Sequence, residues 1–268
     1  MQLNISPNSI ETVTKIKADL ISCNDKYLFS NIEFIRPYVV VYLDQLFRNN
    51  NLSKDIRFLP GKRKTHKYLH QIGCNFLYGH SPKIQDFNED NMIKLKYFNG
   101  TEDDVEEQTI NWIKKNIYPL LQLNNEKLKK NIMRNIWEII QNSLTHSESS
   151  NGISVCGQLY PKKKYFELAF YDFGIGIPNK IKKKFGTKLN LKETEYIKWA
   201  MGKGNSTQNK ANAGMGLFFL RNFIKINSGY FQVISNNEFF GHIYSSDEEA
   251  IKMDSFFDGV LINLRINY

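Results

Sequence analysis

The sequence predicts a mixed α/β fold of the α+β kind, in which a small α/β unit precedes a larger domain. Three patterns support this prediction. Apolar residues recur at helical intervals over residues 126–145, and apolar and polar residues alternate over residues 164–172, as in a strand. Residues 16–72 follow the order strand, helix, strand, helix, which favours a parallel sheet element. With 268 residues, 41% of them hydrophobic, the chain can form one large or two modest domains.

The small unit is expected within residues 1–80. Apolar residues at alternate positions predict its strands, and stripes of apolar residues at helical spacing predict its helices. The expected elements are strands over 16–22 and 55–59 and helices over 34–47 and 65–72. This part of the chain also faintly resembles STAS-type regulatory modules, by pattern alone.

Residues 81–104 are predicted to be a linker, because Pro82, acidic clusters and the Asn99-Gly100 turn interrupt any long periodicity. Thr101 is a candidate N-cap for the helix that follows, which ends near Pro119. The larger domain is then expected to span residues 105–268.

The larger domain contains further predicted strands and helices. Residues 152–160 and 164–172 are expected to form a hairpin around the turn at residues 161–163. The remaining predicted elements are helices starting at Pro178 and over 193–201 and 217–224, and strands over 230–235, 239–244 and 260–266.

A polar edge runs along the predicted helix 126–145. Glu138, Asn142 and His146 are spaced four residues apart, so they lie on one side of the helix, next to its apolar stripe. The amide oxygen of Asn142 is a suitable ligand for Mg²⁺, and the Glu138 carboxylate can orient or deprotonate a water molecule. The alternative for this pattern is a solvated helix edge.

Two glycine turns follow this helix in the sequence. The first is Asp172-Phe-Gly174-Ile-Gly176, where glycines let the backbone approach a flat ligand and Asp172 can accept a hydrogen bond from an exocyclic amine. The alternative here is an ordinary turn after a strand. The second is Gly214-Met-Gly216 before an apolar helix, where free backbone N–H groups and the helix dipole suit phosphate.

In order and spacing, these motifs resemble the GHKL ATPase superfamily, which includes gyrase-type topoisomerases, large heat-shock chaperones, histidine kinases and mismatch-repair ATPases. The resemblance covers residues 105–268 and implies a two-layer α/β sandwich. The matching residues are Glu138 and Asn142 in the N-box, Asp172, Gly174 and Gly176 in the first glycine box, and Gly214 and Gly216 in the second.

The resemblance implies ATP and Mg²⁺ as ligands. Asn142 would hold Mg²⁺, Asp172 would bind the adenine amine, and the turn from Gly214 through Met215 and Gly216 to Leu217 would bind phosphates. The family's last strand commonly carries a threonine after a glycine. Here the pair is Gly259-Val260, which lacks the hydroxyl group and weakens one expected adenine contact.

Residues 202–207 resemble the lid of this family, which closes over the phosphates. Lys203, Ser206 and Thr207 are candidate phosphate contacts by charge and by hydroxyl donation. A flexible surface loop is the alternative.

The type of reaction stays open at this point. Glu138 is the candidate catalytic base, but Arg134 one turn earlier can pair with it instead. His66, His70 and His80 lack both the context of a histidine-kinase phosphoacceptor and metal-ligand spacing. We expect ATP hydrolysis or phosphotransfer in signalling, as in an anti-sigma-type protein kinase, or alternatively a nucleotide-gated interaction module with little turnover. The expected partner is a regulatory protein, and a homodimer is a further possibility.

Composition limits the expected partners and cellular location of the protein. The net charge is +9, but the lysines are scattered, which favours a solvated basic surface over a nucleic-acid site. Cys23, Cys74 and Cys156 are few and widely spaced, as expected for reduced thiols in a cytoplasm. The sequence shows no signal-peptide pattern and no apolar run of about twenty residues, so we expect a cytoplasmic protein outside the membrane.

Overall fold

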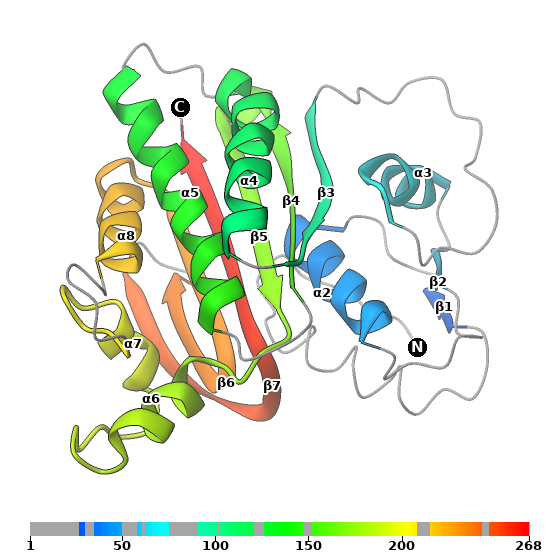
Figure 1. Ribbon diagram of the computed structural model, residues 1–268. Helices are drawn as coiled ribbons and strands as arrows, with labels where there is room; N and C mark the ends of the chain where they lie inside the picture. Colours follow the sequence, from blue (N-terminus) through cyan, green and yellow to red (C-terminus); the bar gives the residue numbers. More distant parts are fainter. Residues whose placement is uncertain are drawn as a thin grey trace.

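A five-stranded antiparallel sheet lies at the centre of the protein, with the strand order β3-β4-β5-β7-β6. The computed structural model describes residues 27–29, 35–49, 58–60, 63–74, 91–100, 102–120, 126–146, 152–207, 215–242 and 247–267. The strands are β3 (Met92–Phe98), β4 (Ile153–Tyr160), β5 (Tyr165–Asp172), β6 (Tyr230–His242) and β7 (Glu248–Asn267). Helices cover both faces of the sheet (Figure 1). The predicted α+β class is therefore confirmed.

The middle strand β5 is buried along its whole length. Phe166, Leu168 and Phe170 pack into one hydrophobic core, whereas Ala169 and Tyr171 pack into the other. Because successive side chains of a strand point to opposite faces, this strand separates the two cores. Its last residue, Asp172, therefore reaches the end of the sheet inside the protein.

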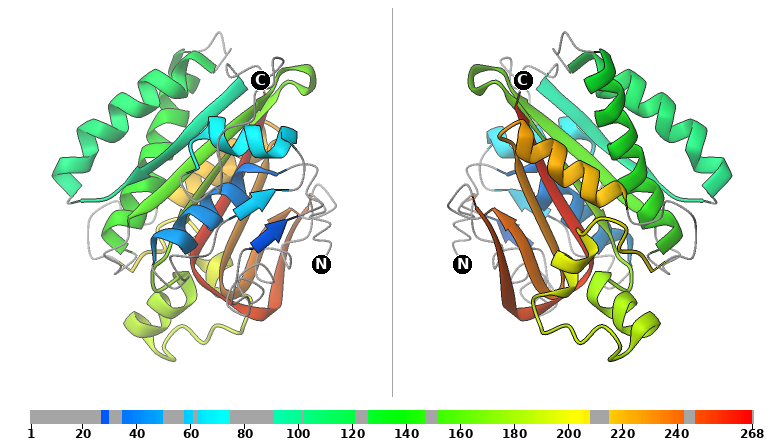
Figure 2. Two further views of the ribbon diagram at one scale, coloured as in Figure 1. Left: turned by 90° about the vertical axis from the view of Figure 1, so that its right-hand side faces the viewer. Right: turned by 90° about the vertical axis from the view of Figure 1, so that its left-hand side faces the viewer.

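One helical layer consists of α4 (Glu102–Asn116), α5 (Glu126–His146) and α8 (Gly216–Ile226). The apolar stripe predicted for α5 is buried against the sheet through Ile132, Ile136, Ile139 and Ile140. The right-hand view of Figure 2 shows α5 and α8 in front of the sheet. This layer and the sheet form the α/β sandwich on which the candidate site is built.

The opposite face of the sheet is covered by α2 (Pro37–Arg48), which comes from the predicted small unit. The Tyr42 ring lies 5.3 Å, centroid to centroid, from both Tyr171 and Phe257 of the sheet. The Asp44 carboxylate accepts a hydrogen bond of 2.6 Å from the Ser154 hydroxyl. The left-hand view of Figure 2 shows α2 in front of this face. The described part of the N-terminal segment thus shares a hydrophobic core with the sheet.

A buried ion cluster fixes the start of α2. Glu167 on β5 is 1% exposed, and its Oε1 lies 2.5 Å from Arg36 Nη1 and 2.9 Å from Arg265 Nη2. Two guanidinium groups therefore share one buried carboxylate. An arrangement of this kind is costly to break from one side.

The other described N-terminal elements are two short strands and a helix. Strand β1 (Tyr27–Phe29), at residues where no strand was predicted, pairs in parallel with β2 (Phe58–Pro60), which overlaps the strand predicted over 55–59. Helix α3 (Arg63–Ile72) overlaps the helix predicted over 65–72. The strand predicted over residues 16–22 lies outside the described residues.

The predicted linker over residues 81–104 differs from the structure. Residues 92–98 form β3, which pairs with β4 at the edge of the main sheet. Met92, Ile93 and Phe98 bury their side chains there. The turn residues flanking this short strand led to the expectation of a linker.

The two strands predicted over 230–235 and 239–244 are one strand, β6, with an irregularity at Asn236, where φ is 53°. Its partner β7 begins at Glu248, well before the predicted residue 260. The added part of β7 is mostly exposed, so it carries little apolar alternation to reveal it. No helix within the described ranges is long and apolar enough to cross a membrane.

Candidate nucleotide-binding site

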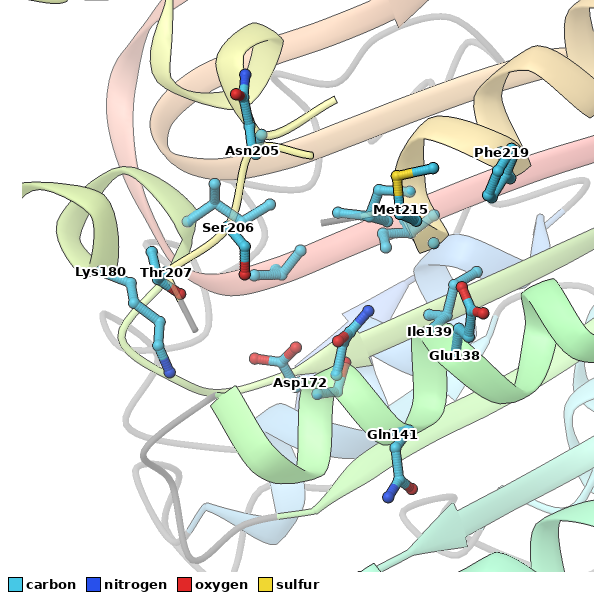
Figure 3. A pocket seen from close by; sticks show the side chains of 18 of the residues that line it. Glu138, Ile139, Gln141, Asp172, Lys180, Asn205, Ser206, Thr207, Met215 and Phe219 are labelled. Atoms are coloured by element: carbon cyan, nitrogen blue, oxygen red, sulfur yellow. The ribbon is translucent and has the colours of Figure 1, made fainter. Parts of the chain in front are cut away.

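A cavity of about 530 Å³ lies between α5, α8, the short helices α6 (Ile177–Phe185) and α7 (Tyr196–Ala200), and the sheet. This volume falls in the range typical of small-molecule sites, roughly 300–1,000 Å³. Nine of the predicted site residues line it: Glu138, Asn142, Asp172, Gly176, Ser206, Thr207, Met215, Gly216 and Leu217. They come from four segments of the chain, namely the α5 edge, the first glycine turn, the predicted lid and the start of α8, and the fold brings them together around one space (Figure 3).

Asp172 is the buried acid of this cavity. It ends β5 and is 2% exposed. Burial raises the pKa of its carboxyl group to about 7, against the opposing effects of a hydrogen bond from Ser143, the Gly174 backbone N–H and the charge of Lys180. The Gly174 N–H donates to Asp172 Oδ1 over 3.1 Å. Gly174 does not line the cavity and instead positions this carboxylate.

The first glycine turn is held in place by the irregularity in β6. The Asn236 side chain donates to the Ile175 carbonyl and accepts from the Asn179 N–H, both over 3.2 Å. Ser235 Oγ accepts from the Ile177 N–H over 2.9 Å. A Cβ atom added at Gly176, where φ is +84°, would lie 2.5 Å from Asn236 Nδ2. Glycine is therefore required there both by conformation and by space.

The backbone at Gly259 on β7 requires the glycine of the Gly259-Val260 pair. Its φ is +77°, and an added Cβ atom would lie 1.9 Å from the Asp172 carbonyl oxygen. The strand can approach Asp172 this closely only with glycine. Val260 and Ile262 then form an apolar wall of the cavity.

The polar edge of α5 lies along the cavity as predicted, because Glu138 and Asn142 both line it. Glu138 Oε1 accepts a hydrogen bond of 3.1 Å from Arg134 Nε. The Arg134 side chain is 73% exposed and that of Glu138 is 19% exposed. The pairing that the sequence left open is therefore present. His146, the third residue of the predicted edge, ends α5, and its side chain is outside what the structure describes.

The N-terminus of α8 closes the cavity opposite α5. The first turn begins with the Phe219 N–H bonded to the Met215 carbonyl over 2.9 Å. The N–H groups of Gly216, Leu217 and Phe218 precede that first helical bond, as at any helix start. Gly214, which the sequence assigned to the same turn, lies outside the described residues.

Only part of the predicted lid, residues 202–207, lines the cavity. Ser206 and Thr207 line the cavity, and so does Asn205, which donates to the Trp199 carbonyl over 2.7 Å. Lys203 is exposed and does not line the cavity. The lysine that does line it is Lys180 on α6, whose charge acts on Asp172.

Buried Glu238 on β6 holds α7, which carries the lid. Its two carboxylate oxygens accept from the Thr194 N–H over 3.1 Å and from the Ile197 N–H over 3.0 Å. Burial raises the pKa of this carboxyl group. The start of α7 is thereby tied to the sheet.

Sequence reasoning missed several residues of this site. Lys180 follows the first glycine turn at helical spacing, which was an available signal. Ser143, Trp137 and Phe219 sit beside predicted residues on α5 and α8, and they line the cavity. Ser235 and Asn236 gave no local signal, because their role depends on contacts with a segment about sixty residues away.

The cavity has two chemically distinct ends. Figure 3 shows Asp172 and Lys180 at one end and Glu138, Met215 and Phe219 at the other. No cluster of three or more His, Cys, Asp or Glu side chains suited to a metal occurs in the described part of the chain. Glu138 and Asn142 nevertheless offer hard oxygen atoms, which suit a Mg²⁺ ion held largely by phosphate and water.

Comparison with known proteins does not extend this picture. No protein-family model matches the sequence, and a search of curated proteins gives no match.

Proposed function

We propose that this protein binds Mg-ATP in the cavity beside α5 and hydrolyses it, or transfers its terminal phosphate, in a cytoplasmic regulatory role. The observation that supports this most is the buried carboxylate of Asp172 at the end of a cavity of about 530 Å³ that also holds a polar helix edge and a helix N-terminus. The motif resemblance to GHKL ATPases supports the same proposal.

Adenine is the base that fits Asp172. An ionised carboxylate accepts hydrogen bonds, and adenine presents an exocyclic amine, whereas guanine presents a carbonyl oxygen at the same position. The apolar wall of Val260 and Ile262 suits the flat face of a purine. ATP should therefore bind at least tenfold more tightly than GTP.

Two sets of groups suit the phosphates. The first-turn N–H groups of α8 and the hydroxyl groups of Ser206 and Thr207 lie at the cavity, whereas Lys180 lies at the Asp172 end. Asn142 would hold Mg²⁺, which neutralises phosphate charge when bound. Glu138 is the candidate base that orients water or a partner hydroxyl group.

A second candidate function has its own supporting observation. The ion pair with Arg134 engages one of the two carboxylate oxygens of Glu138, the candidate base. A nucleotide-gated interaction module with little turnover would need no such base.

Calorimetry with ATP and Mg²⁺ tests the binding proposal. Asp172→Ala should weaken ATP binding at least tenfold, whereas Asp254→Asn, an exposed position on β7, should leave it unchanged. Absence of ATP binding to the wild-type protein would refute the proposal.

Phosphate release and label transfer separate the two candidate functions. If Glu138 is the base, Glu138→Gln should abolish turnover and retain ATP binding. Tight binding with no turnover by the wild-type protein, alone or with a partner, would favour the interaction module.

A further inference from the structure

A second, apolar hollow lies between α4 and α5. It encloses about 270 Å³ and is lined by Ile110 and Ile113 of α4 and by Met133 and Trp137 of α5, with Glu106 and Arg134 at its rim. Ile113 belongs to the core, whereas Ile110, Met133 and Trp137 are only partly buried. This apolar groove is separate from the nucleotide cavity.

The groove and the cavity share a wall. Arg134 and Trp137 line both spaces. Arg134 is also the residue paired with Glu138. A molecule seated in the groove would therefore touch two residues that also border the candidate active site.

Helix α5 carries two buried hydrogen-bond donors that need an acceptor: Trp137 borders both the groove and the nucleotide cavity, whereas Gln141 borders only the nucleotide cavity. Trp137 Nε1 and Gln141 Nε2 are buried one helical turn apart, and neither atom has a hydrogen-bond partner within the described structure. Gln141 as a whole is 9% exposed. Leaving such a donor unpaired costs about 1–3 kcal/mol, so an acceptor brought by another molecule would be favoured.

The charge around the groove is mainly positive. Lys127, Lys130 and Arg134 follow one another at spacings of three and four residues, so they form a ridge on the exposed side of α5. Lys114, four residues after Ile110, is exposed beside the groove on α4. Opposing charges are present on α4, at Glu106 on the rim and at exposed Glu107, three residues before Ile110. Acidic groups on a binding partner would complement this surface, whereas the same basic face of a second copy of this protein would be repelled.

We infer that this groove docks an acidic amphipathic helix of a partner protein, and that its occupancy is sensed in the nucleotide cavity through Arg134 and Trp137. An apolar side chain of the helix would enter between Ile110 and Met133, as helices bind in grooves elsewhere. A carboxylate of the same helix would compete with Glu138 for Arg134. The docking part stands on the groove itself, whereas the coupling part rests on the proposed ATP-binding function.

The test uses two labelled synthetic peptides of about five helical turns with the same leucine stripe. One carries glutamates beside the stripe, and the other carries lysines. Titration with the full chain, followed by fluorescence anisotropy, should give a dissociation constant at least tenfold lower for the acidic peptide. Raising the salt concentration should weaken that binding.

Variants locate the binding surface. Met133→Asp, which lies in the groove and does not line the nucleotide cavity, should weaken acidic-peptide binding at least tenfold. Phe256→Asp, at an exposed apolar residue of β7, is the matched control and should leave binding unchanged. Circular dichroism and ATP calorimetry on both variants check that they are folded.

Several outcomes would overturn the inference. These are equal affinity for the two peptides, no binding of either, or no effect of Met133→Asp. Sedimentation that shows a wild-type dimer converted to a monomer by Met133→Asp would assign the groove to a second copy instead. Coupling predicts at least a threefold change in ATP affinity at saturating acidic peptide, and an unchanged affinity would refute that part. Loss of ATP binding altogether would refute the proposed function without affecting the peptide result.

Discussion

The carboxylate of Glu138 lies directly against the Cα atom of Gly216, so that a Cβ atom added at Gly216 would meet Glu138 Oε2 at 2.1 Å. This contact joins the middle of α5 to the first residue of α8. It also gives the second glycine turn a role that backbone conformation alone does not supply. The glycine leaves room for the carboxylate that the proposed reaction uses.

Gly216→Ala should therefore act through Glu138. The clashing atom is the end of a flexible side chain, so the free energy of unfolding should change by no more than about 1 kcal/mol. Turnover of ATP should nevertheless fall at least tenfold, because the carboxylate has to move. In a Glu138→Ala background the same substitution should have no further effect on turnover or stability, and a double-mutant cycle measures this coupling. Additive effects of the two substitutions would contradict the contact.

Asp172 should make stability depend on pH. Its folded pKa of about 7 lies above the ordinary value of 3.8, so the folded state holds the proton more tightly than the unfolded state. The stabilising contribution is fully present below about pH 4 and is lost as pH rises to about 7. The total change is on the order of 4 kcal/mol. Urea unfolding of wild type and Asp172→Asn between pH 4 and 8 tests this. The free energy of unfolding of wild type should fall relative to that of the variant as pH rises to about 7 and should then level off. A wild-type value that keeps a constant offset from the variant would refute the assignment.

ATP binding should follow the opposite trend. The ionised Asp172 carboxylate accepts the adenine amine, so affinity should rise as pH increases through about 7. Calorimetry over this range, with the pH-insensitive comparison provided by Asp172→Asn, measures the effect. Affinity that falls over the same range would rule out the carboxylate as the acceptor.

Asn236 should be needed for the first glycine turn. Asn236→Ala removes two hydrogen bonds and places alanine at a positive φ, so we expect a loss of about 2 kcal/mol in stability and weaker ATP binding. Asn236→Gly tolerates the backbone conformation and isolates the contribution of the amide. The neighbouring Asn237→Ala serves as the control. Equal effects at both positions would show that the amide does not hold the turn.

Glu167→Ala should loosen α2 from the sheet. The substitution leaves Arg36 and Arg265 close together without their shared carboxylate, which typically costs about 3–5 kcal/mol. Urea unfolding measures the loss. The exposed pair of Glu193 and Lys252 is the control, because Glu193→Ala should leave the midpoint unchanged. A comparable loss in both variants would contradict the structural role of the buried cluster.

The sequence predicted those parts of the site that local spacing encodes. Periodicity predicted that Glu138 and Asn142 share one helical edge and that Asp172 ends a strand, and the structure has them there. Lys203 was selected by charge within a glycine-rich loop, but side-chain direction in a loop follows no period, and Lys180 lines the cavity instead.

Long-range packing escaped prediction for a different reason. The apolar stripe of α2 shows that the helix is buried but does not identify its partner surface. Likewise, β3 and the first half of β7 gain their strand character from neighbouring strands, and their own sequences are short or polar. Predicted boundaries at residues 81 and 105 therefore fell where local turn signals were dense.

The docking of α2 onto the far side of the sheet limits how the chain can be trimmed. A version starting at residue 105 would lose the edge strand β3 and would leave Tyr171 and Phe257 open to water. We expect such a shortened protein to aggregate or unfold, so it is unsuited to testing the proposed ATP binding. Residues 105–268 therefore cannot be transferred alone to another protein, and any exchange of the N-terminal segment would have to preserve the face that Tyr42 presents to the sheet.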